Sequence, residues 1–108
     1  MDRRKLIRKL KGFKAQIKSR YNPSKVILFG SMANGKSHKD SDVDIIIVSK
    51  IFEGKKSFKR APDLSLEWHL KTDIGLPVDF LCYTPEEFDR LRKQITVVRE
   101  AVENGIEI

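Results

Sequence analysis

Two aspartates separated by a single residue, Asp42 and Asp44, carry the clearest chemical signal in this chain of 108 residues. They open the apolar run 45–48, and the segment 43–48 is typical of a buried β-strand. Because side chains alternate faces along a strand, we expect both carboxylates to project together, with Cα atoms about 6.6 Å apart. Earlier in the chain, residues 25–31 predict another strand that ends in a Gly-Ser turn. Carboxylates that converge beside such a turn suit divalent cations that hold a nucleoside triphosphate.

A third carboxylate, Asp79, lies inside the apolar run 78–82. A charge in an apolar strand is costly unless a cation or a hydrogen-bond donor meets it. A salt bridge to one of the many lysines would satisfy this requirement. The functional interpretation places Asp79 with Asp42 and Asp44 at one end of the sheet, as a third metal ligand or as a base near an attacking hydroxyl. Two metal ions held there would stabilise the entering and leaving oxygens of an in-line phosphoryl displacement.

Two other motifs compete for the same residues. Residues 30–37 match the phosphate-loop pattern G-x-x-x-x-G-K-[ST] and follow a predicted strand. A phosphate loop continues into a long apolar helix, whereas here a new strand begins a few residues later, so we expect the match to be coincidental. Residues 40–44 resemble the opening of a calcium loop, but Ile45 and Ile51 occupy the positions that require glycine and glutamate. The calcium loop is therefore rejected.

The net charge of +7 is concentrated at the start of the chain, where residues 1–20 hold nine Lys or Arg and a single acid. A helix with this charge can meet nucleic acid, an anionic membrane or an acidic protein partner. A solvated helix face is an equally good explanation, because exposed helices are rich in charge. Nucleic acid is not favoured, since the helix lacks the aromatic residues on which single strands stack.

Length and composition predict a single domain that spans residues 1–108, with one core. No stretch has the apolar length of a transmembrane helix, and no apolar signal segment precedes the predicted fold. The lone cysteine, Cys82, excludes a disulfide within the chain and fits a reducing compartment. We therefore expect a cytoplasmic protein without a membrane partner, and Cys82 as a small core residue.

Periodicity predicts helices and strands in alternation. The first half reads as a helix over 2–20, a strand over 26–29, a turn or single helical turn within 31–41, and a central strand over 43–48. The second half reads as a loop over 49–62, a helix over 63–74 ended by Gly75, a strand over 78–82, one long helix capped by Thr84 and ended by Asn104-Gly105, and an edge strand over 106–108. This order predicts a small α/β sandwich in which helices cover the sheet.

Two of these helices are defined by apolar stripes that we expect to be buried. In the helix over 63–74 the stripe consists of Leu66, Leu70 and Ile74, at four-residue spacing. This spacing favours a helix over a strand, although Leu64, Leu66, Trp68 and Leu70 also alternate as they would in a strand. The long final helix is expected to bury five apolar residues, namely Phe88, Leu91, Ile95, Val98 and Val102.

The combination of Gly30-Ser31, the segment Ser41-Asp42-Val43-Asp44 and Asp79 within Leu76–Leu81 resembles the minimal nucleotidyltransferases of the polymerase-β superfamily. The similarity extends over nearly the whole chain. It implies a mixed β-sheet flanked by helices in a single small domain. It also implies magnesium-dependent transfer of a nucleoside monophosphate, most simply AMP from ATP, to an acceptor.

The same resemblance assigns roles to individual residues. Three aspartates match the catalytic metal ligands of a two-metal Mg²⁺ site: Asp42, Asp44 and Asp79. Five residues are expected to contact the nucleotide: Gly30, Ser31, Asn34, Lys36 and Ser41. Members of the family often carry arginine in the segment after the Gly-Ser pair, and in this chain that segment is Met-Ala-Asn. Lys36 is the nearest candidate to replace that charge.

Many similar small proteins are antitoxins that accompany an all-α HEPN protein, and some of them adenylylate this partner. The resemblance therefore implies an adenylyltransferase-type antitoxin that modifies a HEPN toxin. The alternative is a binding module with a vestigial site, which neutralises its partner by contact alone. The presence of all three aspartates favours the enzyme.

Overall fold

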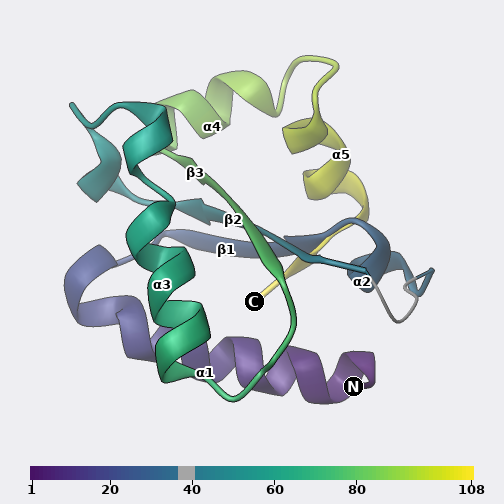
Figure 1. Cartoon of the computed structure of the whole chain (residues 1–108). Coiled ribbons are helices and arrows are strands. Elements are labelled where there is room, and N and C mark those ends of the chain that lie inside the picture. Colours follow the sequence, from purple (N-terminus) through teal and green to yellow (C-terminus); the bar gives the residue numbers. More distant parts are fainter. Residues whose placement is uncertain (37–40) are drawn as a thin grey trace.

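The computed structural model describes residues 1–36 and 41–108, which form a four-stranded sheet with helices packed on both faces (Figure 1). In chain order the elements are α1 (Arg3–Tyr21), β1 (Lys25–Phe29), α2 (Ser31–Asn34), β2 (Val43–Val48), the short 3₁₀ turns η1 (Lys50–Phe52) and η2 (Ser57–Lys59), α3 (Pro62–Lys71), β3 (Val78–Tyr83), α4 (Pro85–Leu91), α5 (Val97–Asn104) and β4 (Ile106–Glu107). The first helix, the single helical turn and all four strands are confirmed, with bounds that differ from the predicted ones by a residue at most.

The sheet is mixed, as the predicted fold class requires. Its strand order is β3-β2-β1-β4, with β1 antiparallel to both neighbours and β2 parallel to β3. Strand β2 is central and is buried on both faces, since Ile45 and Ile46, which project to opposite sides, are both fully buried. A parallel pair needs a crossover connection, and the segment that contains α3 supplies it.

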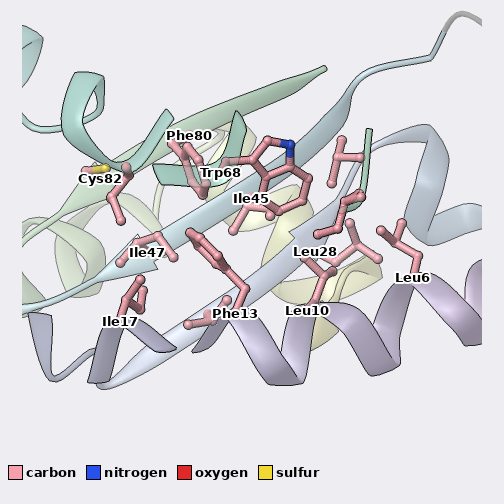
Figure 2. Close-up of a cluster of buried hydrophobic side chains, with 14 of the residues drawn as sticks. Leu6, Leu10, Phe13, Ile17, Leu28, Ile45, Ile47, Trp68, Phe80 and Cys82 are labelled. Atoms are coloured by element: carbon pink, nitrogen blue, oxygen red, sulfur yellow. The ribbon is translucent and has the colours of Figure 1, made fainter. Parts of the chain in front are cut away.

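Helices α1 and α3 cover one face of the sheet with the larger part of the core (Figure 2). The predicted stripe of α1 is confirmed, because Leu6, Leu10, Phe13 and Ile17 are all buried. Phe13 lies 5.4 Å from Trp68 of α3 and 5.8 Å from Phe80 of β3, measured between ring centroids. Aromatic pairs of this kind add about 0.5–1.5 kcal/mol each beyond the burial of their area.

The opposite face carries a smaller core beneath α4 and α5 (Figure 1). Its buried residues are Ile27, Ile46, Val48, Phe88, Val98 and Ala101. Helix α4 begins with the predicted capping box, in which the Thr84 hydroxyl accepts from the Glu87 backbone N–H and the Glu87 carboxylate accepts from the Thr84 N–H. These reciprocal bonds set the start of α4 at the end of β3.

The predicted orientation of α3 is wrong. Leu66 and Leu70 are 58% and 72% exposed, whereas the helix buries Leu64, Glu67 and Trp68. The polar groups of the buried residues have hydrogen-bond partners in the interior. The Trp68 indole N–H donates to the Leu76 carbonyl over 2.8 Å. The Glu67 carboxylate, in turn, accepts hydrogen bonds from two residues of α1, Gln16 and Arg20. Helix α3 also ends at Lys71, four residues before the glycine expected to terminate it.

The single final helix is also wrong, because the chain forms two helices, α4 and α5, in its place. Thr96 causes the break: its hydroxyl accepts from the Arg99 backbone N–H as the N-cap of α5 and donates to the Leu91 carbonyl. A capping threonine followed by two valines favours a new helix start over continuation. As a result Ile95 is 96% exposed and Val102 is 46% exposed, although both were expected in the core.

Helix α1 carries nine of the 22 Lys and Arg residues of the chain, namely Arg3, Arg4, Lys5, Arg8, Lys9, Lys11, Lys14, Lys18 and Arg20. Within residues 1–36 and 41–108, two of them form ion pairs with acids, Lys9 with Asp73 and Arg20 with Glu67. None of the helices in this part of the chain is long and apolar enough to cross a membrane. The role of the basic face remains the prediction stated above.

Cys82 lies in the core as predicted. Burial raises the pKa of its thiol to about 12, so the reactive thiolate is scarce at neutral pH.

The loop predicted over 49–62 contains one buried cation, Arg60, which is 6% exposed. Its guanidinium donates to the backbone carbonyls of Lys55 and Cys82 and lies 2.6 Å from the Glu87 carboxylate. These bonds tie the loop to the end of β3 and to the start of α4. The Glu87 pKa is lowered chiefly by its hydrogen bond to Arg60.

Replacing Arg60 with alanine is expected to destabilise the fold by about 2–4 kcal/mol at pH 7, because a partly buried carboxylate loses its cation. Since the Glu87 pKa is lowered in the folded state, the stabilisation by this pair is present at neutral pH and is lost as the pH falls below 4.5. Chemical unfolding at pH 7 and pH 4 measures both effects, with Lys59→Ala as the exposed control. Equal stability of the two variants would show that the pair does not support the fold.

Candidate active site

Two of the predicted aspartates are neighbours in the sheet. Asp44 of β2 and Asp79 of β3 are register partners in the parallel pair. Ile46 and Val48 pack in the core under α4 and α5, so Asp44, at even spacing from them, projects to that same side. Register partners of adjacent strands project to the same face and lie about 4.8 Å apart in the backbone. The two carboxylates therefore share one side of the sheet, at the end where both strands begin.

The turn after β1 lies against the same carboxylate. Phe29 is the register partner of Asp44, so Gly30 follows directly beside it. A Cβ added to Gly30 would lie 2.4 Å from Asp44 Oδ2, and the backbone at Gly30 has φ +72° and ψ −156°. This conformation is essentially restricted to glycine. Both the backbone and the close approach to Asp44 thus require glycine at this position.

The charges of the other two aspartates act on Asp44. The pKa of Asp44 is raised above its ordinary value, first by partial burial and then by the negative charges of Asp79 and Asp42. Asp44 is half-buried, while Asp42 and Asp79 are exposed. Three carboxylates that repel one another are stabilised by a cation between them.

This donor set fits a hard divalent cation. All three side chains offer carboxylate oxygens, which Mg²⁺ and related ions prefer over softer ligands. Among the described residues, no group of three or more acidic, His or Cys side chains is already gathered into a chelating cluster. Asp42, Asp44 and Asp79 are thus the residues that would hold such an ion.

The five residues predicted to contact the nucleotide lie in two places. Gly30 and Ser31 form the turn into α2, and Ser31 is its first residue. Asn34 and Lys36 are exposed at the other end of α2, where the Asn34 side chain accepts from the Lys36 backbone N–H over 3.0 Å. Ser41 is buried just before Asp42. The structure brings Gly30 and Ser31 to the aspartates, and the nucleotide contacts of all five residues stay predictions.

The phosphate-loop alternative does not agree with the structure. A helix begins at Ser31, directly after β1, and ends within four residues, so no long helix starts at Lys36 in the described part of the chain. Ser37 and Asp40, which the phosphate-loop and calcium-loop patterns require, lie outside the described residues.

Sequence reasoning missed one residue near this site. Arg3, at the start of α1, donates from Nη1 to the Ala33 carbonyl of α2 over 2.8 Å. Thirty positions separate the two residues, and no local pattern reports a contact over that distance. The basic composition of α1 was the sole signal available, and it does not distinguish Arg3 from its neighbours.

A mixed sheet that brings acidic side chains from two parallel strands beside a glycine turn and a short helix is the arrangement of a nucleotidyltransferase. The sequence matches the family described as nucleotidyltransferase domain over residues 10–104, a span that includes all three aspartates. The chain therefore belongs to the nucleotidyltransferase domain family. Enzymes of this family generally use nucleoside triphosphates and divalent metal ions.

Comparison with solved structures agrees with this assignment. The fold is similar to that of a candidate nucleotidyltransferase from Sulfolobus solfataricus, with 26% sequence identity and a TM-score of 0.61 over 82% of this chain and 75% of that one. Another structure of a candidate nucleotidyltransferase is 19% identical, with a TM-score of 0.49 over 81% of this chain and 87% of that one, and adds no argument of its own. No curated protein matches the sequence significantly.

Proposed function

We propose that this protein is a metal-dependent enzyme that transfers AMP from ATP to a hydroxyl group of a protein acceptor. The observation that carries the proposal is the register pair of Asp44 and Asp79, with Gly30 packed against Asp44. This geometry concentrates negative charge at a glycine turn, where a divalent cation and a triphosphate can neutralise each other.

In the proposed reaction, Asp42 and Asp44 would hold the divalent ions, while Ser31 and the backbone after Gly30 would hold the triphosphate. When bound, the ions would supply positive charge to the entering acceptor oxygen and to the leaving pyrophosphate oxygen. Asp79 serves as a third ligand or accepts the proton of the acceptor hydroxyl. The acceptor oxygen forms a bond to the α-phosphorus, the bond from that phosphorus to the bridging oxygen breaks, and pyrophosphate leaves.

The acceptor that we propose is a HEPN-type protein, which would make this chain an adenylylating antitoxin. The exposure of Asp42 and Asp79 supports a large acceptor, because carboxylates at the surface are accessible to a residue on another protein. The resemblance to minimal nucleotidyltransferases supports the choice of AMP and of this partner.

A non-catalytic antitoxin is the second candidate. The observation that favours it is the Met-Ala-Asn segment after Gly30-Ser31, where related enzymes often carry an arginine that binds phosphate in a bidentate manner. A protein of this kind would neutralise its partner by contact and would need neither metal nor nucleotide.

Nucleotide binding is expected to depend on metal. Without a divalent cation, the carboxylates repel the phosphates, so we expect the affinity for ATP to be weaker by roughly tenfold or more. Calorimetric titration with ATP in the presence of Mg²⁺ and in the presence of a chelator measures this difference. Equal affinity in both conditions would count against a site that joins the metal and the triphosphate.

The acceptor is tested by mass spectrometry. A co-encoded HEPN partner incubated with the protein, ATP and Mg²⁺ should gain the mass of one AMP, and the omission of Mg²⁺ should prevent the gain. An unmodified partner that is nevertheless neutralised would favour the non-catalytic antitoxin.

A further inference from the structure

A cation from the start of α1 lies at the short helix that follows the glycine turn. Arg3 Nη1 donates to the Ala33 carbonyl over 2.8 Å and lies 3.8 Å from the position that a Cβ at Gly35 would occupy. Helix α2 is four residues long, or about 6 Å at the usual rise per residue. The guanidinium therefore lies at the C-terminal end of α2, about one helical turn from Ser31, whose neighbour Gly30 packs against Asp44. Figure 1 shows the start of α1 lying close to α2.

The remaining donors of Arg3 are available for a ligand. Its printed hydrogen bond to Ala33 occupies one terminal nitrogen, and no acidic side chain in residues 1–36 or 41–108 forms an ion pair with it. Arginine carries five N–H donors in a planar fork, which leaves several for another acceptor. An arginine whose backbone contact holds it in place, without an acid, is prepared to bind an anion.

The surface next to Arg3 is hollowed. A depression of about 540 Å³ is lined by Asp2, Arg3, Arg4 and Ile7. The Asp2 carboxylate is engaged as the helix cap, accepting from the Lys5 backbone N–H over 2.7 Å. The two arginines give the depression a positive charge, which complements phosphate oxygens.

We infer that Arg3 binds the phosphate tail of the nucleoside triphosphate and supplies the charge that the Met-Ala-Asn segment after Gly30-Ser31 lacks. The inference rests on the proposed function and adds a binding residue to that site. Its physical basis is that a guanidinium binds phosphate through two parallel hydrogen bonds and carries a positive charge. The neutral side chain of asparagine cannot supply that charge. The contact to Ala33 brings Arg3 to within about one helical turn of Ser31, although the two residues are distant in the sequence.

Three variants separate a ligand contact from a structural role. Arg3→Gln keeps a side-chain donor for the Ala33 carbonyl but removes the charge. Arg3→Lys keeps the charge but removes the planar set of guanidinium donors. The control, Arg8→Ala, removes the same type of charge from an exposed position further along α1. Affinities for ATP and for AMP, each with Mg²⁺, are measured by calorimetry. Thermal melts establish that each variant is folded.

We expect Arg3→Gln to bind ATP roughly tenfold to a hundredfold more weakly than the wild type and to bind AMP almost unchanged, because the lost contacts are to the phosphate tail. The ATP affinity of Arg3→Lys should lie between those of the wild type and Arg3→Gln, and the ATP affinity of Arg8→Ala should match that of the wild type. If Arg3→Gln matches the wild type, or if Arg8→Ala weakens ATP binding equally, Arg3 is not a specific phosphate ligand. If the wild type does not bind ATP with Mg²⁺ at all, the proposed function itself fails, and the inference with it.

Discussion

Replacing Asp42 and Asp44 with asparagine is expected to lower AMP transfer by at least two to three orders of magnitude while the metal-free protein stays folded. Asparagine retains the size of aspartate but not the charge that holds a divalent cation. The loss of one strong electrostatic contact to a transition state costs about 10²- to 10³-fold, and loss of the metal removes more than one such contact. Incorporation of labelled AMP into the acceptor measures the effect.

Replacing Asp44 alone with asparagine is expected to increase the stability of the metal-free protein, although it should lower the activity. The folded-state pKa of Asp44 is raised, so the charged form destabilises the fold above the unfolded-state value of 3.8, and this cost disappears as the pH falls below that value. Asp44→Asn should therefore raise the melting temperature of the metal-free protein at pH 7 but not at pH 3. Asp73→Asn is the matched control, because the Asp73 pKa is lowered by its hydrogen bond to Lys9 and the variant should not gain stability.

Two results would contradict the assignment of these aspartates. If the double variant unfolds, Asp42 and Asp44 are needed for the structure and the site is misplaced. If the double variant is folded and still neutralises a HEPN partner in cells, catalysis is not the working mechanism. The second result would support the non-catalytic antitoxin.

Replacing Gly30 with alanine is expected to abolish activity by displacing the Asp44 carboxylate. The added methyl carbon would lie 2.4 Å from Asp44 Oδ2, so either the carboxylate or the turn must move. The backbone conformation at Gly30 adds a cost of about 1–3 kcal/mol for any residue other than glycine. We expect a lower melting temperature and loss of metal-dependent ATP binding, measured by thermal melts and calorimetry.

Gly54 provides the control for this substitution. Its φ is also positive, at +75°, but no atom lies within 4 Å of the position of an added Cβ. Gly54→Ala should therefore lower stability by about 1 kcal/mol through backbone strain and leave ATP binding unchanged. If both alanine variants bind ATP equally well, the contact between Gly30 and Asp44 does not shape the site.

The strands and the acidic residues were accessible from the sequence because they follow local rules. Alternation and apolar runs locate β1, β2 and β3, and the capping box locates the start of α4. The mixed sheet came from the resemblance to a family, since strand order depends on contacts between distant segments. The comparisons and the structure confirm this fold.

The errors arose where tertiary contacts decide between two acceptable local patterns. In α3, both the Leu66–Leu70 spacing and the Leu64–Trp68 spacing fit a helix, and the buried hydrogen bond of Trp68 selects the second. In the final segment, Thr96 fits a helix interior as well as an N-cap. Its hydrogen bond to Leu91 across the break selects the cap.

The contacts around the candidate site could not be predicted for the same reason. Gly30 was recognised as part of the turn, but its approach to Asp44 depends on the register of β1 against β2. The bond from Arg3 to Ala33 depends on how α1 crosses the sheet.

The register between β2 and β3 constrains how this gene can vary. A residue inserted between Val78 and Asp79 would reverse the faces of the strand, placing the aspartate towards the aromatic core and Phe80 towards the smaller core beneath α4 and α5. An insertion of the same size in the loop that leads from β2 to α3 leaves the strand alternation intact. We therefore expect insertions and deletions among related sequences to occur in the connecting loops and not within the strands. The relative position of Asp44 and Asp79 then stays fixed by the pairing of β2 with β3.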